Sequence, residues 1–181
     1  LTQVAPECYE KLGGLAVMNP PLRDRPHWEA SWKAVRDGRV DVVSSDHAPH
    51  PLEAKQLPWP KCPAGLTGTQ TIVPVMLDHV NAGRLSLSRL VDLMAAGPAR
   101  VYGLQTKGRM AVGFDADFTL VDMKAEREIT NDWIVTPAGW TPFDGTRVTG
   151  WPMATIVRGT VVMQDNEVPG APTGQPAKFA P

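Results

Sequence analysis

The sequence is poor in the residues that build disulfide frameworks, thiolate metal sites and membrane spans. Its 181 residues include only 2 cysteines, Cys8 and Cys62, and their spacing fits neither a disulfide framework nor a zinc site made of thiolates. We therefore expect both to be free thiols. No apolar run approaches the roughly 20 residues of a spanning helix, and the first residues lack the pattern of a signal peptide. We expect a cytoplasmic protein with no membrane contact.

An excess of charge of either sign is also missing. The 18 basic and 19 acidic side chains give a formal net charge of -1, which offers no electrostatic grip on nucleic acid or on an anionic membrane. We therefore expect a small molecule as the partner, and no nucleic acid. With 43% hydrophobic residues, a chain of this length can bury one core and a second, smaller one.

The first half of the chain has the pattern of a helix that leads into a buried strand. Apolar residues recur at helical spacing over residues 28–36, and Asp37 and Gly38 mark the end of that helix. Residues 40–45 form a short run rich in valine with little alternation. Such a run is typical of a strand covered on both faces in a parallel sheet. Together the two segments predict half of a β/α repeat.

A long loop and two further helices are expected next. Residues 46–68 are rich in proline, glycine and polar residues and exceed the length of an ordinary connection, and loops of this length are often functional. Helices are predicted over 69–81 and 86–95, the second closed by Gly97 and Pro98.

Past residue 103 the pattern becomes strand-like. Residues 118–121, 154–157 and 161–163 are expected to be strands, the last two joined by a tight turn. We place a boundary near Lys107. The expected units are 1–106 with the β/α elements, a β-rich unit over 107–165, and a tail over 166–181 that is extended or disordered unless it docks on a partner surface.

Residues 45–50, Ser-Asp-His-Ala-Pro-His, come directly after the predicted buried strand. Reactive groups of β/α barrels lie where strands end. Asp46 can ligate a divalent metal, take a proton from water and pass it to a leaving amide nitrogen. His50 can donate to a substrate carboxylate or carbonyl, and His47 can orient the loop or Asp46. Each residue alone is more often a cap or a loop contact, but the cluster at a strand end favours a function.

These residues belong to a longer pattern that resembles the dihydroorotase family. The matching motifs are Asn19-Pro20-Pro21-Leu22-Arg23, Asp37-Gly38, Asp41, Ser45-Asp46-His47-Ala48-Pro49-His50, Pro63-Ala64-Gly65, Gly68-Thr69-Gln70-Thr71, Pro98-Ala99-Arg100-Val101-Tyr102-Gly103-Leu104, Lys107-Gly108-Arg109, Gly113-Phe114-Asp115-Ala116-Asp117 and Gly139-Trp140-Thr141-Pro142-Phe143. The resemblance covers about residues 13–164. It implies an α/β fold that forms the C-terminal part of a TIM-type (β/α)8 barrel of a metal-dependent hydrolase, plus strands of a small β-sandwich domain.

The resemblance also implies roles for individual residues. Asp46 is then both a metal ligand and the catalytic base and acid, while Asn19 and His50 hold the dihydroorotate ring and its carboxylate. Ala64 and Gly65 contact the substrate through their backbones, although the family often has an aromatic residue in place of Ala64. Taken alone, Asn19 before two prolines is a turn residue, and Gly65 equally fits ordinary loop flexibility.

The metal ligands of the family are largely missing. Family members carry a His-x-His pair, a carboxylated lysine and two further histidines that bind one or two Zn²⁺ ions, and none of these lies in this sequence. Asp46 alone cannot hold zinc firmly. We therefore expect a fragment, inactive by itself and unstable or associated without its partner, the missing N-terminal part of the same protein.

The implied function is the reversible cyclisation of N-carbamoyl-L-aspartate to L-dihydroorotate in pyrimidine synthesis, by an enzyme expected to be a homodimer. An allantoinase or hydantoinase that acts on other cyclic ureides is the alternative within the same chemistry. A third interpretation is an inactive homologue that supports aspartate carbamoyltransferase in a complex. The residues Asn19, Asp46 and His50 favour an enzyme, because a scaffold has no physical need of all three.

Overall fold

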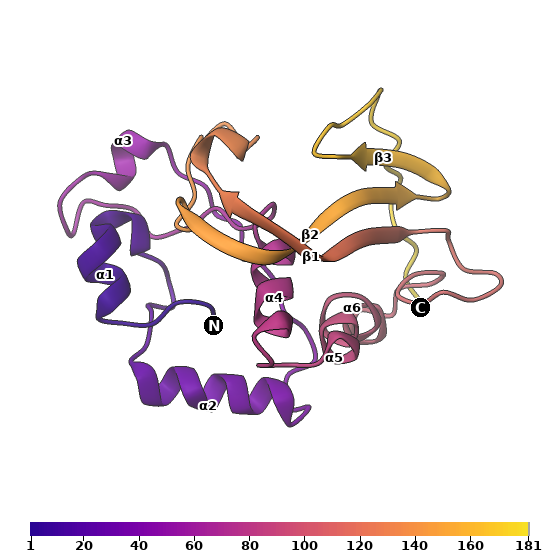
Figure 1. The fold of residues 1–181 in the computed structure, drawn as a ribbon, viewed down its shortest axis with the longest axis horizontal. Coiled ribbons are helices and arrows are strands. Elements are labelled where there is room, and N and C mark those ends of the chain that lie inside the picture. Colours follow the sequence, from indigo (N-terminus) through magenta and orange to yellow (C-terminus); the bar gives the residue numbers. More distant parts are fainter. Residues whose placement is uncertain (181) are drawn as a thin grey trace.

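The computed structural model describes residues 1–180, with helices in the first part of the chain and strands in the second (Figure 1). The helices are α1 (Glu7–Leu12), α2 (Arg25–Arg36), α3 (Leu52–Lys55), α4 (Ile72–Asn81), α5 (Leu87–Val91) and α6 (Gly97–Val101), with the 3-10 turns η1 (Gly13–Ala16) and η3 (Asn131–Trp133) and the π-helical turn η2 (Asp92–Ala96). The strands are β1 (Phe118–Ile129), β2 (Thr146–Val157) and β3 (Thr160–Gln164).

Helix α2 confirms the helix predicted over residues 28–36 and begins three residues earlier. The Asp24 side chain caps it by accepting a hydrogen bond from the His27 N–H, and a proline lies in the first turn, where its missing N–H costs no helical bond. The helix buries Trp32 and Val35, each 2% exposed. Its apolar stripe therefore faces the core, as the helical spacing predicted.

The helices predicted over 69–81 and 86–95 are present, but the predicted end of the second at Gly97 and Pro98 is wrong. Helix α5, capped by Ser86, continues through η2 directly into α6. Pro98 lies in the first turn of α6, directly after the π-helical turn η2, where the regular hydrogen-bond pattern of the α-helix is interrupted. A Cβ on Gly97 would lie 2.1 Å from the Asp41 carbonyl oxygen, so this glycine permits close packing rather than ending the helix.

The strand predicted over residues 40–45 does not form a ladder. The segment is extended, but its hydrogen bonds run to the helices: the Val43 N–H donates to the Leu93 carbonyl at 3.1 Å, and the Arg89 guanidinium donates to the Val40 carbonyl. Within residues 1–180, parallel pairing is limited to one bridge between His47 and Leu66. Valine-rich sequence favours a strand only where a neighbouring strand supplies partners, and none lies beside this segment.

The three strands predicted in the second half are confirmed and are longer than expected. They form one antiparallel sheet in the order β1-β2-β3. In the long β1–β2 pair, Phe118 lies opposite Ile156 and Ile129 opposite Thr146, with a bulge after Asp122 whose carboxylate accepts two backbone N–H groups. The fold is therefore mixed α/β, with the sheet packed against the helices (Figure 1).

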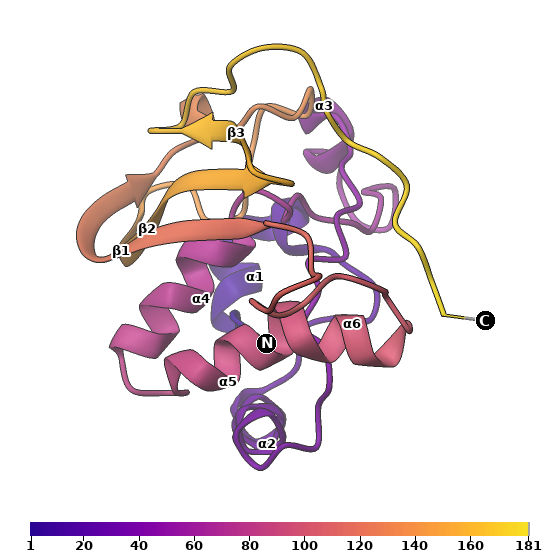
Figure 2. The ribbon, with the colours of Figure 1, turned by 90° about the vertical axis from the view of Figure 1, so that its right-hand side faces the viewer.

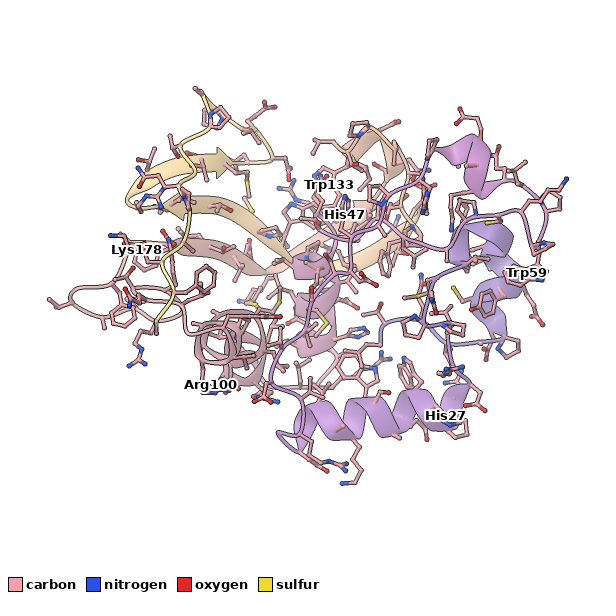
Figure 3. The ribbon with its side chains drawn as sticks, turned by 180° about the vertical axis from the view of Figure 1, so that it is seen from behind. His27, His47, Trp59, Arg100, Trp133 and Lys178 are labelled. Atoms are coloured by element: carbon pink, nitrogen blue, oxygen red, sulfur yellow. The ribbon has the colours of Figure 1, made fainter. Side chains whose placement is uncertain are left out.

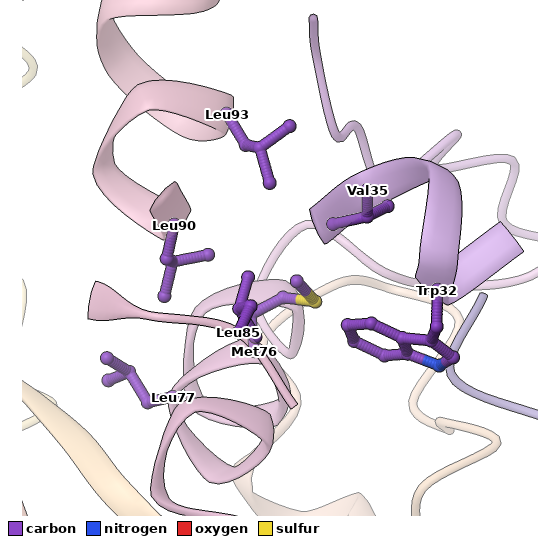
Figure 4. Close-up of a cluster of buried hydrophobic side chains, with 7 residues drawn as sticks. All are labelled: Trp32, Val35, Met76, Leu77, Leu85, Leu90 and Leu93. Carbon is purple, nitrogen blue, oxygen red and sulfur yellow. The ribbon is translucent and has the colours of Figure 1, made fainter. Parts of the chain in front are cut away.

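Helix α4 joins two hydrophobic cores. One contains Trp32, Val35, Met76, Leu77, Leu85, Leu90 and Leu93 (Figure 4). The other contains Val75, Ile129, Val148 and Trp151 and lies between α4 and the sheet. Strand β2 approaches α4 closely, since a Cβ on Gly150 would lie 2.7 Å from the Leu77 Cβ. Val121 and Met123 of β1 pack on the first core, so the helices and the sheet share that core. The domain boundary placed near Lys107 stays a prediction.

The C-terminal tail is extended and docks on the chain itself (Figure 2). The Gln105 N–H donates to the Lys178 carbonyl at 2.9 Å and the Ala180 N–H donates to the Gly103 carbonyl at 2.7 Å. The docking surface for this segment is therefore the turn that follows α6.

Candidate functional site

Asp46 stands at the end of the extended segment 40–46, where the chain turns sharply. Its φ is 45°, a conformation that non-glycine residues rarely adopt and that is enriched at functional turns. Its side chain is exposed. It contributes to the lining of a cavity of about 180 Å³, together with Ser45, Leu66, Gly68 and Thr71. The carboxylate therefore lines the cavity and is not buried in the core.

His47 fixes the loop that faces Asp46. Its Nδ1 accepts hydrogen bonds from the N–H groups of Gly68 and Thr69, at 3.1 and 3.3 Å. This places the proton of a neutral ring on Nε2. His47, labelled in Figure 3, also lines a shallow depression together with residues 134–136. The loop-orienting role expected for His47 is thus present in its contacts.

His50, Ala64 and Gly65 lie together. The His50 Nε2 is 3.0 Å from the Ala64 carbonyl oxygen, and since a carbonyl only accepts, Nε2 carries the proton. Gly65 has a φ of 144°, and a Cβ there would lie 2.4 Å from the Ala48 carbonyl oxygen and 3.0 Å from the His50 Cδ2. A glycine is therefore required at this position by geometry, while its contact with substrate stays a prediction.

The segment before Asn19 is joined to the same group of residues. The Gly65 N–H donates to the Val17 carbonyl at 3.0 Å, so this N–H is used within the chain. Asn19 itself is exposed, two residues further on. Within residues 1–180 no side-chain hydrogen bond links Asn19 or Asp46 to His50, so these three share a region without direct bonds between their side chains.

Lys55 is a residue of this region that the sequence did not reveal. It has 0% exposure, and its ammonium donates to the carbonyls of Val17 and Pro63 at 2.8 and 2.9 Å. Burial lowers the pKa of Lys55. The sequence Leu52–Lys55 has the polar composition of a surface turn, so no local signal separates Lys55 from the exposed Lys61.

The described residues do not form a complete zinc site. Among residues 1–180 no three His, Cys, Asp or Glu side chains gather as metal ligands, whereas a catalytic zinc takes three protein ligands. Two of the other histidines have different partners, since His27 pairs with Asp24 and His79 with Arg84. Asp46 can supply one carboxylate ligand, and the remaining ligands of such a site are not among residues 1–180.

Cys8 and Cys62 are free thiols, as expected. No helix within residues 1–180 combines the length and the apolar character needed to cross a membrane.

Comparison with known proteins places the chain in a family. The model of the amidohydrolase family matches residues 11–162. A dihydroorotase of Pyrococcus furiosus is 46% identical over 156 residues, which are 86% of this chain and 36% of that protein. An L-hydantoinase of Paenarthrobacter aurescens is 38% identical over 164 residues, 88% of this chain and 36% of that protein.

A solved structure agrees with these similarities. The L-hydantoinase (dihydropyrimidinase) from Arthrobacter aurescens matches with a TM-score of 0.87 and 37% identity, covering 91% of this chain and 38% of that one. The chain spans a little over a third of the length of the curated relatives it matches. The family match covers most of the 181 residues, and the chain therefore belongs to the amidohydrolase family.

Proposed function

We propose that this chain is the C-terminal part of a zinc-dependent dihydroorotase, a (β/α)8-barrel enzyme that interconverts N-carbamoyl-L-aspartate and L-dihydroorotate. The observation that carries the proposal is the arrangement of residues 45–50, in which Asp46 lines a cavity and His50, four residues on, is held against the Ala64–Gly65 pair. The 46% identity to a dihydroorotase of Pyrococcus furiosus supports it.

Asp46 is proposed to move the proton. Its exposed carboxylate at the rim of the cavity accepts a proton from the attacking water and returns it to the ring nitrogen that leaves when the amide bond breaks. Zinc, held by Asp46 together with ligands that lie outside this chain, would supply Lewis acidity and an activated water. In the direction of ring closure Asp46 acts in the reverse order.

His50, Asn19 and the backbone of Ala64 and Gly65 are proposed to hold the substrate. Because His50 already gives its Nε2 proton to the Ala64 carbonyl, it can donate from Nδ1 to a substrate carboxylate only as an imidazolium. A bound carboxylate favours that charged form. The Asn19 amide offers both a donor and an acceptor to the ring. The Gly65 N–H is engaged by Val17, so the pair is proposed to contact the substrate through its other backbone groups.

The proposal extends to the partners. The missing N-terminal part of the same protein would provide the other metal ligands and the strands beside residues 40–45, the complete enzyme would be a homodimer in the cytoplasm, and aspartate carbamoyltransferase is a candidate partner. The similarity to an L-hydantoinase in sequence and in structure favours a hydantoinase as the second candidate function, since both reactions open a cyclic amide.

The test uses the full-length protein with its bound metal. Turnover of dihydroorotate is compared with that of hydantoin and allantoin, and zinc is measured in the same preparation. The variant Asp46→Asn is expected to lower kcat by about 10²- to 10⁴-fold, the usual contribution of a general acid or base. The matched control is Asp41→Asn, an exposed carboxylate on the same segment that pairs with Arg100.

The outcomes separate the candidates. Dihydroorotate turnover that is lost in Asp46→Asn and kept in Asp41→Asn supports the proposal. A preference for hydantoin or allantoin assigns the alternative activity. A full-length protein without zinc and without turnover of any of the three would point to the scaffold interpretation.

A further inference from the structure

We propose that Lys55 and Trp140 are positioning residues that bind together the three segments carrying Asn19, His50 and the Ala64–Gly65 pair. This inference rests on the proposed function, because those segments are taken as the substrate-binding loops. Neither residue is placed against the substrate. They act by holding the backbone on which the binding groups stand.

The ammonium of Lys55 is the centre of this cluster. It is fully buried, and among residues 1–180 no carboxylate forms an ion pair with it. Burying an uncompensated charge is costly. The compensation comes from the carbonyls of Val17 and Pro63 at 2.8 and 2.9 Å and from the Trp140 ring, whose centroid is 5.7 Å from Nζ.

The two carbonyls belong to the two loops that meet at Gly65. Val17 is two residues before Asn19, and Pro63 directly precedes Ala64. The Val17 carbonyl also accepts the Gly65 N–H at 3.0 Å. One carbonyl therefore receives both the Lys55 ammonium and the Gly65 N–H, so that loss of the ammonium loosens the junction between the loops.

Trp140 connects the third segment. Its Nε1 donates to the His50 carbonyl at 2.8 Å, and its own carbonyl accepts the hydroxyl of Thr67 at 2.8 Å. The side chain is 1% exposed, so its indole is fixed by packing. The face of the indole contacts the cation while its edge holds the backbone of His50.

Burying a lysine side chain in this arrangement has a cost in free energy that needs an explanation. Lysine loses side-chain entropy and hydration when it is buried, and a long apolar side chain would fill the same space without that cost. What the ammonium adds is several donors that converge on carbonyls of different loops. The geometry therefore favours a role in loop placement over a role in filling the core.

The test uses the full-length protein with its metal. Lys55→Met keeps the length of the side chain and removes the donors, and Trp140→Phe keeps a ring and removes the Nε1 donor. Lys61→Met, in the same loop but exposed, is the matched control. Two kinds of measurement are made. Steady-state kinetics give KM and kcat for dihydroorotate, and hydrogen exchange of the Gly65 amide reports the junction without any substrate.

For Lys55→Met we expect KM to rise about tenfold, equivalent to about 1.4 kcal/mol. The change in kcat should stay below about threefold, because Asp46 is not held by the cluster. Exchange of the Gly65 amide should become faster. Trp140→Phe should raise KM in the same direction, and Lys61→Met should match the wild type in both measurements.

Unchanged KM in both variants would overturn the proposal, whether or not exchange of Gly65 changes, because the cluster would then serve stability alone. If Lys55→Met does not accumulate as folded protein, Trp140→Phe decides by the same criterion. A wild-type protein that leaves dihydroorotate untouched refutes the proposed function instead. The same KM criterion is then applied with the hydantoin that it does hydrolyse.

Discussion

Burial of His79 should make the stability of the fold depend on pH between 6.5 and about 4. His79 lies in α4, 8% exposed, and packs edge-on against Trp32 with ring centroids 4.6 Å apart. Its Nδ1 is 3.1 Å from the Arg84 guanidinium. Arginine only donates, so Nδ1 accepts and the proton is on Nε2, which has no partner among residues 1–180. Burial first, and the Arg84 charge second, lower the pKa of His79 to about 4.

The sign and the size follow from the difference between the folded and unfolded pKa values. The unfolded chain, with a pKa near 6.5, binds a proton on His79 at a pH where the folded protein does not. Stability is therefore fully present above pH 6.5 and falls as the pH drops toward 4. The interval is about 2.5 pH units at about 1.4 kcal/mol each, so this group costs up to about 3 kcal/mol of unfolding free energy.

The assay is urea unfolding of the full-length protein, followed by tryptophan fluorescence at pH 7.5 and 4.5 for the wild type and His79→Gln. Glutamine keeps an acceptor for Arg84 and does not titrate, so the difference between the two proteins isolates His79 from the carboxylates. We expect the wild type to lose about 2 to 3 kcal/mol more than the variant over this range. Equal losses in both proteins, or an imidazole that titrates near 6.5 by NMR, would refute the reasoning.

Three further predictions concern the site and the core. Gly65→Ala should destabilise the protein by more than the roughly 1 to 2 kcal/mol of a positive φ alone and should raise KM, because its Cβ would meet the Ala48 carbonyl. Gly38→Ala is its control, with positive φ but open space around it; equal effects would exclude the clash. Trp32→Ala should lower the unfolding free energy by about 3 to 5 kcal/mol, whereas Trp59→Ala, 77% exposed, should change it by less than about 0.5 kcal/mol. Residues 1–181 expressed alone should associate or unfold without cooperativity, since residues 40–45 lack strand partners; cooperative unfolding as a monomer in sedimentation and urea experiments would contradict this.

The local structure of the chain could be predicted where neighbours in sequence carry the signal. The Asp24 cap and the spacing of Trp32 and Val35 define α2, because both effects act within one helical turn. The strands of the sheet were also predictable, since alternating side chains and the turn between β2 and β3 are local features. The motif at residues 45–50 indicated a reactive loop for the same reason.

Contacts between distant segments decided the rest. The valines of residues 40–45 favour a strand, but a strand forms a ladder only beside a second strand. Whether a second strand lies there cannot be read from the segment itself. Gly97 and Pro98 have the pattern of a helix end, yet packing against Asp41 lets the helix continue. The burial of Lys55 depends on carbonyls 38 and 8 residues away, and that of His79 on the packing of α2. The sequence by itself thus determined α2, α4, α5 and the three strands of the sheet, whose causes lie within a few residues. The tertiary structure alone decided which polar groups are buried and which loops meet, because those depend on what lies across the fold.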